Sequence, residues 1–163
     1  MVAGPTEHNI RLMEEAVAFS VDHVRHGGIP FTALVVGRDG IILGRGVNRV
    51  REHHDPTAHA EVEAIRAACS AHGNAHLQGA TLLASGEPCA LCYMSALYAG
   101  ISRIFFAADR EEAATYGFDY RGTYSLFVRD PQSWPSFAVE KLAVADGLRP
   151  FVEFHARSRA SQG

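Results

Sequence analysis

The sequence predicts an α/β fold in which helices cover both faces of a mixed central sheet of about five strands. Stretches with apolar residues three and four positions apart, typical of amphipathic helices, alternate with short β-like runs along the chain. The first two β-like runs flank Gly37-Arg38-Asp39-Gly40, and Asp-Gly between apolar runs is a hairpin signal. A hairpin followed by alternating helices and strands indicates a mixed sheet with helices on both sides.

Capping and stop residues give the approximate bounds of each element. The first helix carries apolar residues from Ile10 to Val24, with Thr6 as its cap and Gly27-Gly28 as its end. The later predicted helices are 59–72, 89–99, a short one opened by the capping-box pattern Asp109-Arg110-Glu111-Glu112, and 146–157. The predicted strands are 31–36, 41–47, 80–84, 103–107 and 137–144. Residues 117–135, rich in Gly, Pro and aromatic side chains, are expected to form a loop.

Composition places the chain among ordinary globular proteins. Its 163 residues fit one domain over 1–163, and 47% hydrophobic with 20% charged residues is an ordinary balance. No run approaches the ~18 apolar residues of a spanning helix, and the first ten residues do not read as a secretory signal, so we expect a cytoplasmic protein. The net charge of −3 and the absence of a basic stripe favour a small substrate over a nucleic acid and give no sign of a membrane partner.

The three cysteines indicate metal or redox chemistry in a reducing compartment rather than a disulfide framework. Cys89 and Cys92 form a C-x-x-C pair, whereas Cys69 lies on the apolar face of a predicted helix and is expected in the core.

Two short motifs carry the predicted chemistry. His59 and Glu61 lie in Thr-Ala-His-Ala-Glu, Cys89 and Cys92 lie in Pro-Cys-Ala-Leu-Cys, and both motifs fall at predicted helix starts. Cysteines three apart share one helix face, and a helix N-terminus favours the thiolate that binds metal. One imidazole and two thiolates hold zinc with a fourth position left for water, whose pKa zinc lowers toward ~7.

Glu61 is interpreted as the proton carrier. Hydrolysis by a zinc-activated water needs a base that takes a proton from the water and an acid that gives one to the leaving group, and one carboxylate can do both in turn. Two other kinds of site are possible for these residues, and each accounts for fewer of them. A closed structural zinc site needs a fourth ligand, for which His53 and His54 are the nearest candidates, and a redox pair leaves His59 and Glu61 unexplained.

The two motifs together resemble the cytidine deaminase superfamily, in which His-x-Glu followed by Pro-Cys-x-x-Cys is the zinc deaminase signature. Asp55-Pro-Thr-Ala-His-Ala-Glu61 and Glu87-Pro-Cys-Ala-Leu-Cys92 are similar to bacterial guanine deaminases and to tRNA adenosine deaminases, and the segment through Gly117-Phe118-Asp119 favours the former. The resemblance implies a three-layer α/β/α fold, one catalytic Zn²⁺ per chain and a homodimer.

The same resemblance implies the residues that contact a nucleobase or nucleoside substrate. Asn48 is expected to hydrogen-bond the base, although an Asn at the end of a hairpin strand is often a turn residue. Phe31 is either a pocket wall or a core residue, and Tyr124, Phe127 and Trp134 either stack on a base or anchor the loop to a dimer partner. The implied substrate-binding residues are Phe31, Asn48, Ala60, Asp119 and Tyr120.

One departure from the guanine deaminase pattern concerns the substrate. A second aspartate follows Gly-Phe-Asp in that family, whereas this chain has Tyr120, and a phenol does not offer a carboxylate's charge at pH 7. Asp119 replaces it only if the loop shifts, and a turn-stabilising role is favoured. The sequence therefore predicts a guanine deaminase-like enzyme, with cytidine, cytosine, guanosine or a triazine as alternative substrates and a tRNA adenosine deaminase as a less favoured one. A non-catalytic zinc protein would tolerate loss of Glu61.

Overall fold

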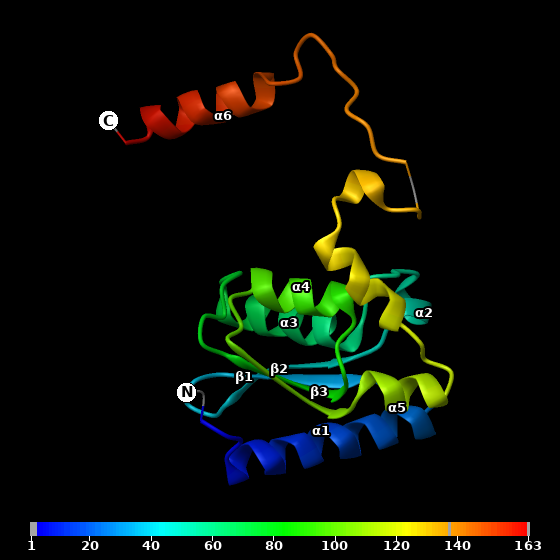
Figure 1. Cartoon of the computed structure of the whole chain (residues 1–163). Coiled ribbons are helices and arrows are strands. Elements are labelled where there is room, and N and C mark those ends of the chain that lie inside the picture. The colour runs from blue at the N-terminus through cyan, green and yellow to red at the C-terminus, as the bar shows by residue number, and fades with distance from the viewer. Residues whose placement is uncertain (1–2, 137, 163) are drawn as a thin grey trace. The chain divides into compact units, whose positions relative to one another are not determined.

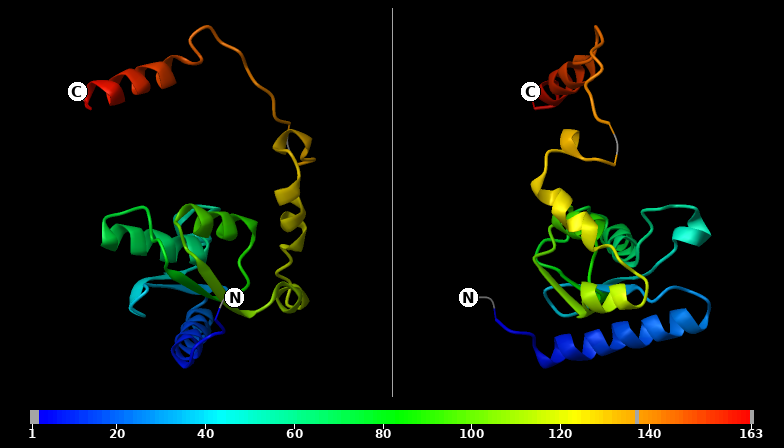
Figure 2. Two further views of the ribbon diagram at one scale, coloured as in Figure 1. Left: turned by 60° about the vertical axis from the view of Figure 1, so that its left-hand side comes forward. Right: turned by 45° about the vertical axis from the view of Figure 1, so that its right-hand side comes forward.

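The structure, a computed structural model, describes residues 3–136 and 138–162 and divides into two compact units. Unit 1 is Met1–Phe127 and unit 2 is Val128–Gly163 (Figures 1 and 2). All predicted site residues belong to unit 1, which also contains the sheet. Within the described parts of both units, no helix is long and apolar enough to cross a membrane.

The sheet of unit 1 is mixed, as predicted. Its strands are β1 (Thr32–Val36), β2 (Ile42–Val47), β3 (Thr81–Gly86) and β4 (Arg103–Ala108), in the order β2-β1-β3-β4. Strand β1 pairs antiparallel with β2 and with β3, and β3 pairs parallel with β4. The sheet of the described chain thus has four strands, and the prediction of about five is wrong. The strand that is missing from it is the one expected at 137–144.

Helices lie on both faces of this sheet. Figure 1 shows α3 (Ala60–His72) and α4 (Ala90–Tyr98) on one side and α1 (Glu7–Arg25) and α5 (Arg110–Thr115) on the other. A short helix α2 (Val50–His53), which the sequence analysis missed, follows β2.

The strands divide their buried side chains between the two helix layers because successive residues point to opposite faces. Ala33 and Val35 pack in the cluster that includes Ala64 of α3, whereas Leu34 and Val36 pack in the cluster that includes Leu12 of α1. A strand buried on both faces explains why all five residues of β1 are buried and why its sequence is a continuous apolar run.

Helix α3 lies unusually close to β2 because two glycines face it. A Cβ atom at Gly46 would stand 2.1 Å from the carbonyl oxygen of Ala60, and one at Gly44 would stand 2.4 Å from that of Ala64. Any side chain at either position would push α3 off the sheet. These two glycines therefore set the height of the first turn of α3 above the strand, which is the turn that carries the predicted site.

The predicted caps of α1 and α5 are present. Thr6 forms a capping box with Asn9, and Asp109 forms one with Glu112. Helices α3 and α4 differ, because their N-caps are His59 and Cys89 and neither side chain caps its own helix. Both side chains are thus available to a ligand at the ends of their helices.

The C-terminal predictions need correction. Phe137 lies outside the described residues, and the described residues 138–144 form no strand and leave Val139, Leu142 and Val144 exposed. An alternating apolar pattern forms a strand only where another strand completes its hydrogen bonds. In the region expected as a loop, short 3₁₀ helices span Arg121–Val128 and Pro131–Ser133.

The last helix begins later than predicted. Helix α6 is Arg149–Ala160 rather than 146–157, and Pro150 lies in its first turn. Proline lacks the N–H that a helix interior requires but is accepted in the first turn, so a helix starting at Asp146 would place it one turn too deep.

Candidate active site

The three predicted zinc ligands converge at the facing ends of α3 and α4. The Nδ1 atom of His59 lies 3.4 Å from Sγ of Cys89 and 3.5 Å from Sγ of Cys92, and the two sulfurs are 3.6 Å apart. Ordinary zinc bond lengths in a tetrahedron place two sulfurs about 3.8 Å apart and a sulfur and a nitrogen about 3.6 Å apart. The three atoms therefore already have the spacing of three corners of a zinc tetrahedron.

The charges of the three groups also fit a cation. A hydrogen bond with Cys92 and the nearby His59 lower the pKa of the Cys89 thiol to about 4, and the contact with Cys89 together with burial raises the pKa of Cys92. The hydrogen bond with Cys89 raises the pKa of His59 above its usual value. Two soft sulfurs and one imidazole form a donor set that zinc prefers, and a dication replaces the protons that these groups otherwise share.

Glu61 lies beside the ligands but outside their cluster. Its side chain is 4% exposed, and the Cys92 thiol donates a hydrogen bond to its Oε2 atom at 3.2 Å. Burial raises the pKa of this carboxyl to about 7. The metal-binding group within the described chain consists of His59, Cys89 and Cys92, and the carboxylate of Glu61 lies next to it.

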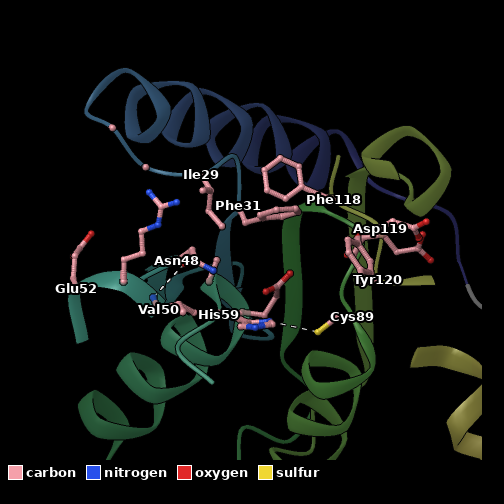
Figure 3. Close-up of a pocket in the computed structure, with 16 residues that line it drawn as sticks. Ile29, Phe31, Asn48, Val50, Glu52, His59, Cys89, Phe118, Asp119 and Tyr120 are labelled. Carbon is pink, nitrogen blue, oxygen red and sulfur yellow. Dashed lines mark hydrogen bonds between the residues drawn. The ribbon is translucent and has the colours of Figure 1, made fainter. Parts of the chain in front are cut away.

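A cavity of about 510 Å³ opens on this cluster (Figure 3). Its volume lies within the range of small-molecule sites. The predicted site residues that line it are Phe31, Asn48, His59, Ala60, Glu61, Cys89, Asp119 and Tyr120. Residues from β1, the end of β2, α3, α4 and the loop after α5 thus meet at one pocket although 89 positions separate the first from the last.

Asn48 forms the turn that was one of the two roles its sequence left open. Its Oδ1 atom accepts the backbone N–H of Val50 at 3.2 Å, an Asx turn that starts α2 (Figure 3). The same residue lines the pocket. The turn therefore holds the amide in place rather than competing with a binding role.

Aromatic rings form one side of the pocket. The ring of Phe31 meets Phe118 edge to face at 5.2 Å and Tyr120 at 6.4 Å between centroids. Phe31 also packs against the core cluster below α3, so it is both a core residue and a pocket residue.

The carboxylate of Asp119 is bound within its own loop. It accepts hydrogen bonds from Nε and Nη2 of Arg121, both at 2.8 Å, and these bonds lower its pKa to about 2. The turn-stabilising interpretation of Asp119 is the one that these contacts favour.

Four residues near the ligands make contacts that the sequence did not predict. Glu87 is 5% exposed and forms an ion pair with Arg110, whose Nη2 lies 2.7 Å from its Oε1. The hydroxyls of Tyr120 and Tyr124 donate to the backbone carbonyls of Glu87 and Pro88. These contacts join positions 23 to 36 residues apart, so no local sequence pattern predicts them.

His53, His54 and Cys69 lie where their simpler interpretations place them. His53 and His54 are exposed in and after α2 and do not join the ligand cluster, which removes the support for a closed structural zinc site. Cys69 packs against the core, as predicted.

Residues 6–108 match the family of the cytidine and deoxycytidylate deaminase zinc-binding region. The match covers more than half of the chain, so the chain belongs to this family of zinc-binding deaminases. The prediction of a zinc-dependent hydrolytic deaminase is thereby confirmed, and the His-Cys-Cys cluster supplies its zinc site.

Among individual relatives, guanine deaminase from Bacillus subtilis is 36% identical over 140 residues, which are 85% of this chain and 88% of that protein. The solved structure of Bacillus subtilis guanine deaminase has a TM-score of 0.81 at 33% identity and covers 90% of this chain and 92% of its own. A tRNA-specific adenosine deaminase from Agrobacterium fabrum is 42% identical over 81 residues, which are 50% of this chain and 53% of that protein. A structure in complex with 2,6-diaminopurine has a TM-score of 0.64 at 28% identity and covers 66% of this chain and 60% of its own.

We predict that Cys89→Ala or Cys92→Ala abolishes stoichiometric zinc binding, because two ligands do not hold the ion against competing chelators. Cys69→Ala is the matched control, since it removes a thiol from α3 without touching the cluster. Metal analysis of the purified variants measures the effect. Full zinc content in either cluster variant would remove that cysteine from the ligand set.

Proposed function

We propose that this chain hydrolyses the exocyclic amino group of a nucleobase or nucleoside, with guanine as the first candidate substrate. One observation carries the proposal: two members of the three-residue metal-binding cluster, His59 and Cys89, and the buried carboxylate of Glu61 line one pocket with the volume of a small-molecule site. A structural zinc site closes its fourth position with protein, whereas a catalytic site leaves it to water.

His59, Cys89 and Cys92 would hold the zinc, whose Lewis acidity supplies an activated water at neutral pH. Glu61 takes a proton from that water and delivers it to the ring nitrogen as the water oxygen bonds to the amino-bearing carbon. It then carries the second proton to the departing amine, the C–N bond breaks and ammonia leaves. The raised pKa of Glu61, about 7, suits a group that must accept and return protons near neutrality.

Donors and aromatic surfaces in the pocket would orient the flat ring. The Nδ2 group of Asn48 and the backbone N–H of Ala60, in the first turn of α3, offer hydrogen bonds to ring acceptors. Phe31 and Phe118 offer apolar contacts. These residues would fix the amino-bearing carbon relative to Glu61.

The likeness to guanine deaminase over most of both chains supports guanine, and the chemistry of the loop supports a second candidate. The carboxylate of Asp119 is bound to Arg121, and position 120 is a phenol, so neither offers a free carboxylate to a ring N–H. A cytosine, a nucleoside or another aminated heterocycle is therefore the alternative. A tRNA substrate is less favoured, because a net charge of −3 opposes binding to a phosphate backbone.

We also propose that the chain forms one three-layer α/β/α deaminase domain over 1–163 and acts as a homodimer in the cytoplasm. The match to guanine deaminase over 88% of that relative supports a single domain. The outer face of α4 exposes Leu91, Met94, Leu97 and Tyr98, an apolar surface that a second copy would cover. A zinc site with two thiolates needs a reducing compartment.

We predict that Glu61→Gln retains zinc and loses turnover by on the order of 10² to 10⁴-fold, because the amide keeps the shape of the side chain but does not take up and release a proton near neutral pH. Glu63→Gln, two residues further along α3 and paired with Arg66, is the matched control. Metal content and ammonia release are measured on both variants. Near-normal turnover of zinc-loaded Glu61→Gln would remove the proton-carrier role.

The substrate is tested by ammonia release from guanine, guanosine, adenine, cytosine, cytidine, 2,6-diaminopurine and aminated triazines. We expect guanine to be hydrolysed fastest, in line with the relatives. Rapid hydrolysis of another compound with inert guanine would assign the loop of Asp119 and Tyr120 to a different substrate. A zinc-loaded protein that releases ammonia from none of them would contradict the proposed function.

The dimer is tested by light scattering coupled to gel filtration. We expect a mass about twice the 17.7 kDa of one chain, and Leu97→Glu on α4 to shift it toward the monomer, because a carboxylate in an apolar interface loses its hydration. Glu111→Lys, an exposed change of charge on α5, is the control. A monomer at micromolar concentration would rule out the homodimer.

A further inference from the structure

The short segment 87–89, which leads into the zinc helix, is held almost entirely by residues from outside that helix. The N–H of Glu87 donates to the carbonyl of Ala108 on β4 at 2.8 Å. Its own carbonyl accepts the hydroxyl of Tyr120 at 2.6 Å, and the next carbonyl, that of Pro88, accepts the hydroxyl of Tyr124. Each backbone group that precedes Cys89 is thus bound by a different element.

The side chain of Glu87 adds a fourth attachment. Its carboxylate accepts the backbone N–H of Arg110 at 2.6 Å and the guanidinium at 2.7 to 3.1 Å, so the first turn of α5 is bound to it through main chain and side chain. The same guanidinium lies over the ring of Tyr124, 3.7 Å from its centroid. Arg110 therefore holds Glu87 and Tyr124 together, and a cation over an aromatic face is itself attractive.

These contacts fix a ligand that its own helix does not fix. Cys89 is the N-cap of α4, has extended backbone angles and makes no side-chain capping bond. The position of its sulfur follows from the orientation of the two peptide groups before it. Residues that contact a metal ligand without binding the metal themselves orient that ligand and tune the affinity of the site.

We propose that Tyr120 and Tyr124 are positioning residues for the zinc ligand Cys89, acting through their hydroxyl bonds to the carbonyls of Glu87 and Pro88. Tyr120 lines the substrate pocket as well, so its bond also fixes one wall of the pocket to the metal segment. The proposal concerns the zinc site and does not depend on which base is hydrolysed. Any effect of these tyrosines on the rate of ammonia release rests on the proposed function.

The test removes single hydroxyls from the zinc-loaded full chain. The variants are Tyr120→Phe, Tyr124→Phe and the double variant, and Tyr116→Phe is the control because Tyr116 is 84% exposed. The first readout is the rate at which zinc passes to an excess of a chromogenic chelator. The second is the visible absorption spectrum of the cobalt-substituted proteins, which reports the geometry of the ligands.

We expect each of the two single variants to release zinc about 10-fold faster than the native chain, the double variant to release it faster still, and the cobalt spectra to shift. Tyr116→Phe should behave like the native chain. If the double variant does not fold, the two single variants carry the test.

Native release rates and native cobalt spectra in Tyr120→Phe and Tyr124→Phe would overturn the proposal. An equal increase in Tyr116→Phe would also overturn it, because the effect would then be general loosening. Failure of the proposed function looks different, since ammonia release is then absent from the native chain while the zinc and cobalt readouts still distinguish the variants.

Discussion

The close approach of α3 to β2 is the contact on which the site depends. Gly44 and Gly46 let backbone meet backbone, and the first turn of α3 consequently lies directly over the end of the strand. His59 caps this turn and Glu61 lies within it, so the spacing between helix and sheet determines where the imidazole and the carboxylate stand relative to the sulfurs of α4. The positions of the site residues thus depend on the absence of a side chain at Gly44 and at Gly46. The metal cluster is the place where two helix ends, each set by its own contacts with the sheet, come within ligand distance of each other.

Burial and neighbouring charges shift the pKa values of three carboxylates of the pocket in different directions. No Lys or Arg among the described residues forms an ion pair with Glu61, and burial raises the pKa of its carboxyl to about 7. Glu87 is equally buried, but Arg110 lowers its pKa and keeps it ionised. Asp119 is exposed and bound to Arg121. Of these three carboxylates, Glu61 has the pKa nearest to neutral pH, so the surroundings and not the residue type make the three groups differ in protonation.

The sequence predicted the local parts of this arrangement well. Turn residues, caps and apolar spacing located four of the strands and four of the long or capped helices, and the paired motifs identified the zinc ligands because their chemistry is tied to fixed spacing. The strand expected at 137–144 failed because a strand is decided by its neighbour and not by its own alternation. The hydroxyl bonds of Tyr120 and Tyr124 and the Glu87–Arg110 pair were out of reach for a related reason. Each joins residues more than 20 positions apart, and nothing in either partner's local sequence encodes the other.

The double attachment of Tyr120 bears on how such a pocket can be redesigned. Its ring lines the cavity while its hydroxyl binds the backbone beside a ligand, so a smaller or charged residue there would alter the cavity and release that backbone together. Laboratory evolution toward a bulkier or more polar compound would meet a trade-off at this position between substrate range and retention of the cofactor. Phe118 and Ile29 line the same cavity without a side-chain hydrogen bond to the metal segment. Library diversity is therefore better directed to positions 29 and 118, where the shape of the cavity can change while the metal geometry is preserved.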